Sequence, residues 1–189
     1  MSEARYRGFD FLSVRKFVRT TYGEDALRAL ADHLAPRGYA GVVTDVIYPE
    51  DWRTLAEFDA LCVALDELFW KPGTERPSVR QGRYTCEDQL KWVHRVAMRL
   101  LRPSWLIENG VALWDKYCDV GKWEVRWPRP NQAGAILTEM PLMSESFCVS
   151  LVGWFERFYQ LCGCRAVRVV HTSCRSRGDE VCRWDGSWQ

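Results

Sequence analysis

Apolar residues recur at helical spacing through the first half of the chain. Leu27, Leu30, Ala31 and Leu34 fall on one helical face, and the segment "APRG" ends that helix. A second stripe runs from Leu55 to Phe69 and ends at "KPG". The same reasoning predicts further helices from Asp10 or Ser13 to about residue 22, over about 86–101, and over 103–118. The segment 71–84, "KPGTERPSVRQGRY", is predicted to be a long loop.

The period changes in the last third of the chain. Residues 122–127 alternate between apolar and polar, which is typical of a strand, and 133–140 can pair with them across "PRPNQ". Ser144 or Ser146 begins a long helix that ends at "CGC". The segments "RAVRVVHTSC" and "EVCRWDGSW" then predict two strands around the turn "RSRGD".

This order of elements favours an α+β fold over alternating βαβ units. We expect N-terminal helices packed on a C-terminal antiparallel sheet, with one long helix between two hairpins. The length of 189 residues favours one domain over 1–189, with a helical part at about 1–120 and a sheet-containing part at about 121–189.

Composition narrows the class of protein. Lys and Arg (26) nearly balance Asp and Glu (25), and the basic residues are dispersed, so no nucleic-acid partner is expected. No apolar run is long enough for a membrane span, and the segment "MSEARYRGFDF" lacks the pattern of a signal peptide. A cytoplasmic location is therefore expected, where the eight cysteines would be thiols or metal ligands rather than disulfides.

Two of these cysteines flank the last predicted turn. Cys174 and Cys182 are equidistant from Gly178, so a hairpin would place them opposite each other. Cys148 precedes them on the long helix, and with His171 the four residues make a Cys3His set of the kind that binds zinc. Spacing alone leaves two interpretations open: a metal site, or reduced thiols packed under a hairpin.

The last third of the chain resembles the vinyl-reductase-type sensor domain, the ligand-binding part of phenol-responsive bacterial regulators. The shared spacing is Cys148, His171, Cys174 and Cys182, with "RSRGDEVCRW" at the turn. The resemblance implies a structural zinc on these residues, although the phenol sensors have an acidic residue where this chain has His171. The segments "FVRTTYGEDALRALADHL" and "IYPEDW" are similar to a myxobacterial paralogous family, a distant relative of haem-nitric-oxide-binding domains and small TRAPP subunits.

A ligand pocket is predicted among the tryptophans. Trp123, Val125 and Trp127 alternate along a strand and so share one face, which the helices must cover. The phenol sensors hold their ligand with a tryptophan about twenty residues before the helix cysteine and a histidine from an earlier helix. The resemblance therefore implies that Trp127 and His94 border a cavity, and the shared strand face predicts the same for Trp123.

Haem and catalysis are not expected from the sequence. His171, Ser173 and Arg175 reproduce the Tyr-x-Ser-x-Arg signature of the haem-binding relatives except at its tyrosine, and no histidine precedes the motif at short range to bind iron. No nucleophile elbow, P-loop or dinucleotide-binding glycine pattern is present. A nucleophilic pair of Cys86 or Cys118 with His94 has nothing in the sequence to fix its geometry.

The sequence thus predicts a non-catalytic sensor or binding module for a small apolar or aromatic ligand, which signals to a partner protein. The alternative is a scaffold subunit of the TRAPP type, a class that dimerises, with its cavity filled by side chains.

Overall fold

A computed structural model describes residues 3–90 and 103–189. The helical elements are α1 (Gly8–Tyr22), α2 (Glu24–Leu34), α3 (Gly41–Thr44), α4 (Leu55–Phe69), α5 (Pro77–Gln89), α7 (Pro103–Gly110) and α8 (Glu145–Leu161), with 3-10 turns at Ala35–Arg37, Val111–Lys116 and Arg175–Arg177. The strands are β1 (Arg5–Arg7), β2 (Trp52–Thr54), β3 (Lys122–Arg129), β4 (Gln132–Thr138), β5 (Arg168–Ser173) and β6 (Cys182–Ser187).

The main sheet is antiparallel, with the strand order β3-β4-β6-β5. Val125 of β3 pairs with Ala135 of β4, and Ala135 pairs with Trp184 of β6. These three side chains therefore lie in one row on the same face of the sheet. A second small sheet joins β1 to β2, and Tyr6 of β1 also bridges to Cys118, next to the start of the main sheet.

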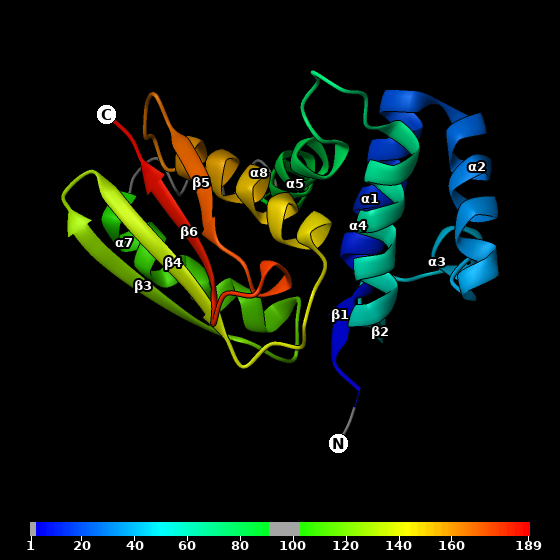
Figure 1. Cartoon of the computed structure of the whole chain (residues 1–189), viewed down its shortest axis with the longest axis horizontal. Coiled ribbons are helices and arrows are strands. Elements are labelled where there is room, and N and C mark those ends of the chain that lie inside the picture. Colours follow the sequence, from blue (N-terminus) through cyan, green and yellow to red (C-terminus); the bar gives the residue numbers. More distant parts are fainter. Residues whose placement is uncertain (1–2, 91–102) are drawn as a thin grey trace.

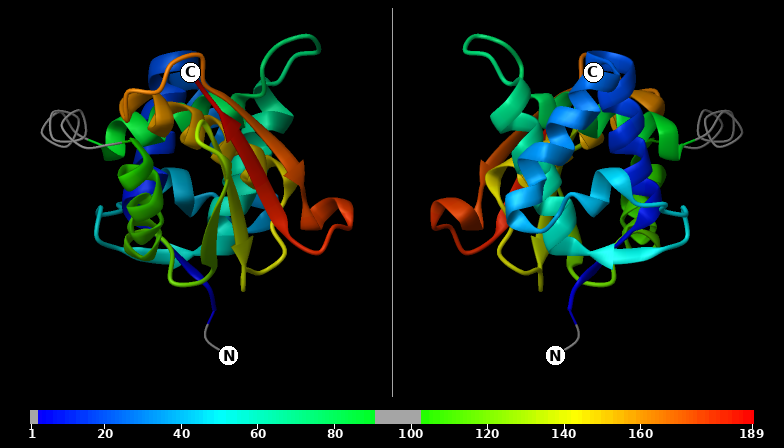
Figure 2. Two further views of the ribbon diagram at one scale, coloured as in Figure 1. Left: turned by 90° about the vertical axis from the view of Figure 1, so that its left-hand side faces the viewer. Right: turned by 90° about the vertical axis from the view of Figure 1, so that its right-hand side faces the viewer.

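The elements form layers (Figure 1). The main sheet lies on one side, α8 and α5 lie in the middle, and α1, α2 and α4 lie on the far side. Helix α8 contacts β5 and β6 on one side and α4 and α5 on the other. The predicted α+β class and the long helix between two hairpins are confirmed. The N-terminal helices reach the sheet through α8. Figure 2 shows the molecule from the side of the main sheet in its left view and from the side of α2 in its right view.

Two glycines allow α5 and α8 to touch backbone to backbone. A Cβ atom on Gly82 would overlap the carbonyl oxygen of Ser150, and one on Gly153 would overlap the carbonyl oxygen of Val79. The two contacts are reciprocal, one glycine from each helix against a carbonyl of the other. Because a carbonyl cannot swing away as a long side chain can, this crossing fixes the distance between the helices.

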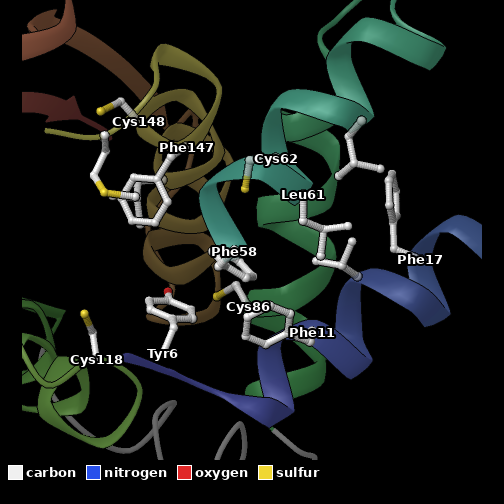
Figure 3. Packing of buried hydrophobic residues seen from close by; sticks show 14 of the residues in the cluster. Tyr6, Phe11, Phe17, Phe58, Leu61, Cys62, Cys86, Cys118, Phe147 and Cys148 are labelled. Carbon is white, nitrogen blue, oxygen red and sulfur yellow. The ribbon is translucent and has the colours of Figure 1, made fainter. Parts of the chain in front are cut away.

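Aromatic rings join α8 to the N-terminal layer (Figure 3). Tyr6 stacks on Phe58 of α4 with ring centroids 4.3 Å apart, and Phe147 of α8 meets both rings edge on at 6.2–6.3 Å. All three side chains are buried. This cluster makes the first turn of α8 part of the same core as β1 and α4.

The loop predicted over 71–84 is confirmed for 71–76 and wrong from Pro77 onward, where α5 begins. Pro77 suits the first helical turn, and the buried carboxylate of Asp66 accepts hydrogen bonds from the Ser78 backbone N–H at 2.9 Å and from the Ser78 hydroxyl at 2.8 Å. Gly82, which suggested a loop, lies inside the helix at its contact with α8.

The neighbouring predictions are only partly testable. The predicted helix over 86–101 falls largely on residues 91–102, outside the described ones, and α5 already covers 86–89. In place of a helix over 103–118, α7 ends at Gly110 and a 3-10 turn follows. Among the described residues, none of the helices has the length and apolar character needed to cross a bilayer.

Candidate ligand cavity and thiol-imidazole cluster

A cavity of about 60 Å³ lies between the inner face of β3 and β4, helix α8, and the segment from α7 to Tyr117. On the usual scale of one water to roughly 10–15 Å³ of such space, it has room for a handful of heavy atoms. Its walls are mostly aromatic. The lining residues are Tyr6, Gln89, Ile107, Gly110, Trp114, Tyr117, Trp123, Val125, Ala135, Leu151, Trp154, Phe155, Phe158 and Tyr159.

Helix α8 supplies the largest part of this wall. Trp154 and Phe158 are one helical turn apart and stack with ring centroids at 5.0 Å. Phe155 meets Trp123 of β3 edge on at 5.4 Å, and Trp123 meets Trp114 in the same way at the same distance. Such edge-to-face contacts orient the rings beyond what area burial alone would do. The wall is therefore built from rings that hold one another in place.

The polar atoms of the wall are few and uncharged. The Trp114 indole N–H donates to the Val120 carbonyl at 2.7 Å, and the Trp154 indole N–H donates to the Gln89 side-chain oxygen at 2.7 Å. Asp, Glu, Lys, Arg and His are absent from the lining as far as the described residues go. A charged molecule would lose its hydration there without gaining a counterion, so the cavity favours a neutral one.

The structure separates the predicted pocket residues. Trp123 lines the cavity, together with Val125. Trp127 is not among the lining residues and instead packs edge on against Trp188, with ring centroids 6.1 Å apart. His94 lies outside the described residues.

Sequence reasoning missed the contributions of α5 and α8 to the cavity. Gln89 fell inside the helix predicted over about 86–101, and the aromatic stripe from Trp154 to Tyr159 indicated only a helix face. The available signal was the density of aromatic residues in that stripe, four among residues 154–159.

The four predicted metal ligands come together at the other end of α8. Cys148 comes from its first turns, His171 from β5, Cys174 from the residue after β5, and Cys182 from the start of β6. Their ligand atoms all lie within 4.8 Å of one another, and the Cys148 and Cys182 sulfurs are 3.7 Å apart. A tetrahedral site with metal–sulfur bonds of about 2.3 Å has sulfurs about 3.8 Å apart.

The polar atoms of this cluster are incompletely hydrogen-bonded. Both ring nitrogens of His171 are buried, and neither has a hydrogen-bond partner. Leaving such atoms unpaired costs about 1–3 kcal/mol each. The hydrogen bond from the Cys148 thiol lowers the pKa of Cys182, with the nearby His171 ring and the Arg175 backbone N–H adding to the effect, and the same pairing raises the pKa of Cys148. This shift favours the thiolate form of Cys182, which is the form that binds metals.

Trp184 connects the cluster to the cavity. Its buried indole stacks on the His171 ring with centroids 4.9 Å apart and donates to the Cys148 carbonyl at 2.9 Å. On its other side it contacts Trp123 and Phe155 of the cavity wall, at 5.4 and 6.0 Å. The ring contacts from Trp114 through Trp123 and Trp184 to His171 are therefore continuous.

Ion pairs tie the turn beside the cluster to the N-terminal layer. Arg177 donates to Glu145 at the start of α8 (3.0 Å), and Arg76 donates both to Glu145 (3.2 Å) and to Asp66 of α4 (2.9 Å). Ser144, the cap of α8, donates to the Asp59 carboxylate of α4. A movement of the turn at Arg175–Arg177 would therefore be transmitted to α4 through these ion pairs.

The sequence and the structure were compared with known proteins. No family model and no curated protein matches the sequence. Solved structures of H-NOX proteins do match the structure. The H-NOX protein from Shewanella oneidensis in its Fe(II)NO state has a TM-score of 0.71 at 13% identity, covering 97% of this chain and 99% of that one. The unliganded Fe(II) H-NOX protein from K. algicida has a TM-score of 0.64 at 10% identity, covering 97% and 96%.

The chain therefore has the H-NOX fold. The distant relation to haem-nitric-oxide-binding domains is supported at the level of the fold. The vinyl-reductase resemblance and the myxobacterial family are matched by none of these comparisons and stay predictions.

The expectation of zinc as the cofactor, with no haem, is wrong by this comparison. Solved structures that share the fold are described by Fe(II) ligation states or by heme distortion. Among residues 3–90 and 103–189, the lining of the cavity includes no histidine to bind iron.

Proposed function

We propose that this chain is a non-catalytic small-molecule sensor domain that binds a small neutral, mainly apolar ligand in the aromatic cavity and signals to a partner protein. The observation that carries the proposal is the cavity itself, a space of about 60 Å³ walled by rings in mutual contact. Protein interiors ordinarily close such spaces, whereas ligand sites keep them.

The route of the signal follows from contacts already described. A ligand that presses on Trp123 acts on Trp184, which contacts both His171 and the Cys148 carbonyl. From there Glu145 and its arginine partners reach α4. Leu142, 65% exposed beside a groove formed with α4, offers an apolar contact for a partner protein.

Filling the cavity should abolish ligand binding without unfolding the protein. Ala135 is buried and lines the cavity, so the flexible side chain of Ala135→Met can occupy the empty space. Thermal unfolding is measured with phenol, indole and cyclopentanone as probes. A probe at a hundredfold excess over its Kd should stabilise the wild type by about 2.7 kcal/mol. Ala135→Met should show no such gain.

Trp127→Leu is the matched control, because Trp127 is on β3 with Trp123 but outside the cavity. It should keep the probe response. Haemin is added in parallel and followed by its Soret absorption. If haemin binds in place of the probes, haem becomes the ligand of this cavity; if neither the probes nor haemin stabilise the wild type, the sensor proposal fails.

We also propose that Cys148, His171, Cys174 and Cys182 hold a divalent transition-metal ion that fixes the β5–β6 turn against α8. The proposal is supported by four buried or half-buried soft ligands converging within 4.8 Å, one of them a histidine with two unpartnered nitrogens. A metal bond to one of these nitrogens would remove that unpaired atom, and thiolates with imidazole suit such ions.

Cobalt(II) is the probe for this cluster, because thiolate-bound cobalt has a characteristic visible spectrum. Reduced protein should take up about one Co²⁺ per chain with thiolate-to-metal absorption, and Cys182→Ser should weaken binding by about tenfold or more. Cys164→Ser, a buried thiol outside the cluster, should leave the titration unchanged. The same spectrum from wild type and Cys182→Ser would place the cobalt elsewhere and exclude the cluster.

A further inference from the structure

The wall of the aromatic cavity is not entirely apolar. Gln89, at the last turn of α5, is the lining residue with a side-chain amide. Its oxygen accepts from the Trp154 indole N–H at 2.7 Å, and its nitrogen donates to the Asp10 carboxyl at 2.7 Å. Because an indole N–H can only donate, the amide oxygen has to face Trp154 and the amide nitrogen has to face Asp10. The orientation of Gln89 is thus fixed by chemistry.

This arrangement leaves hydrogen-bonding capacity unused. The Gln89 amide nitrogen carries two hydrogens, and Asp10 takes one of them. Within residues 3–90 and 103–189, no acceptor for the second hydrogen is found. Asp10 itself is 1% exposed on α1, and its other oxygen, Oδ2, is buried without a partner. Gln89 itself is only half-buried, so its second N–H remains available to a molecule held in the cavity that Gln89 lines.

We infer that the ligand is a small neutral molecule with one hydrogen-bond acceptor, a carbonyl, ether or hydroxyl oxygen, which the free N–H of Gln89 binds. This rests on the proposed function and names the ligand class for the same cavity. The aromatic walls contact the apolar body of the molecule, and the uncharged lining excludes ions. Asp10 is a positioning residue, since it reaches the ligand only through Gln89.

A pair of probes of nearly equal shape tests the inference. Cyclopentanone has a carbonyl oxygen where methylenecyclopentane has a CH2 group. The wild type should bind the ketone about three- to tenfold more tightly, the range for one neutral hydrogen bond. Gln89→Met, which keeps the length but loses the amide, should bind both probes equally. Gln160→Met makes the same change on the exposed side of α8 and should keep the preference.

The positioning role of Asp10 has its own readout. Asp10→Ala should reduce the preference for the ketone, because Gln89 then lacks its anchor, and Asp10→Asn should restore the preference, because the amide oxygen still accepts from Gln89. A purely structural role would not distinguish the two probes.

A measurement on the wild type alone guards against variants that fail to fold. The infrared carbonyl band of bound cyclopentanone should lie below its position in hydrocarbon solvent, as it does when the oxygen accepts a hydrogen bond. Equal affinity for both probes with an unshifted carbonyl band would overturn the inference while leaving the sensor proposal intact. Failure of both probes to bind would overturn both.

Discussion

Replacing Gly153 with alanine is expected to cost this protein about 3 kcal/mol or more of its free energy of unfolding. Alanine ordinarily stabilises a helix relative to glycine by about 1 kcal/mol, so the expected loss of stability is opposite to what helix propensity alone predicts. The cause is the crossing of α5 and α8, where the added methyl would overlap the Val79 carbonyl. Overpacking at a site of this kind typically costs about 1–3 kcal/mol, and more when backbone has to move.

Urea or thermal unfolding measures this effect, and for a chain of this size a loss of about 3 kcal/mol lowers the Tm by roughly 6–12 °C. Gly82→Ala should behave alike, since its methyl would overlap the Ser150 carbonyl. Gly41→Ala is the control, because there the methyl meets only the exposed Asp45 carboxylate, which can turn away. Unchanged stability in both crossing variants would show that the helices can separate at no cost.

Asp10 is expected to lower the stability of the wild type as pH rises above about 4, and Asp10→Asn should remove that effect. Burial raises the pKa of Asp10 well above its ordinary value of 3.8; the hydrogen bond from Gln89 opposes the shift and the nearby Asp88 adds to it. Between the unfolded and the folded pKa, the folded protein holds a proton that the unfolded chain has released. Stability then decreases with pH by up to about 1.4 kcal/mol per unit.

The quantity to measure is the difference in unfolding free energy between Asp10→Asn and wild type, at intervals from pH 4 to pH 8. This difference should grow with pH in favour of the variant. Glu57→Gln serves as a control of opposite sign: burial raises the pKa of Glu57, but the hydrogen bonds from Arg53 and Thr54 and the charge of Arg53 together outweigh it, and the net shift is downward. Wild type should gain over Glu57→Gln as pH rises. A flat profile for Asp10→Asn would show that the carboxyl titrates normally.

The parts of the fold that the sequence predicts well depend on local patterning. The stripe from Leu55 to Phe69 became α4 with the same bounds, and Ser144 caps α8 as expected. The prediction of a loop from Pro77 onward was wrong because the helix there depends on contacts with distant segments. The helix depends on Asp66, whose carboxylate holds Ser78, and on Gly82, whose neighbour Ser150 is far along the chain. Contacts between distant segments leave no periodic signal.

In the candidate site, too, the residues related by local geometry could be predicted from the sequence and the others could not. Cys174 and Cys182 could be paired from hairpin geometry, and the structure brings them within reach of Cys148 and His171. The residues that line the cavity could not be predicted in this way, because the cavity forms only where three helices and the sheet come together. Strand alternation correctly put Trp123 on the inner face, but the same alternation could not show that Trp127, four residues on, passes beyond the cavity to Trp188.

The position of β6 has a consequence for synthesis of the chain. It is the last strand along the sequence, yet it lies inside the sheet, hydrogen-bonded to β4 on one side and to β5 on the other. Until residues 182–187 leave the ribosome, the nascent chain carries two open strand edges, the templates on which foreign strands can add. The cluster of Cys148 and its partners also lacks one member until then. The sheet can therefore close only once β6 has left the ribosome, and chaperones that bind exposed strand edges have their opportunity in the interval before β6 arrives.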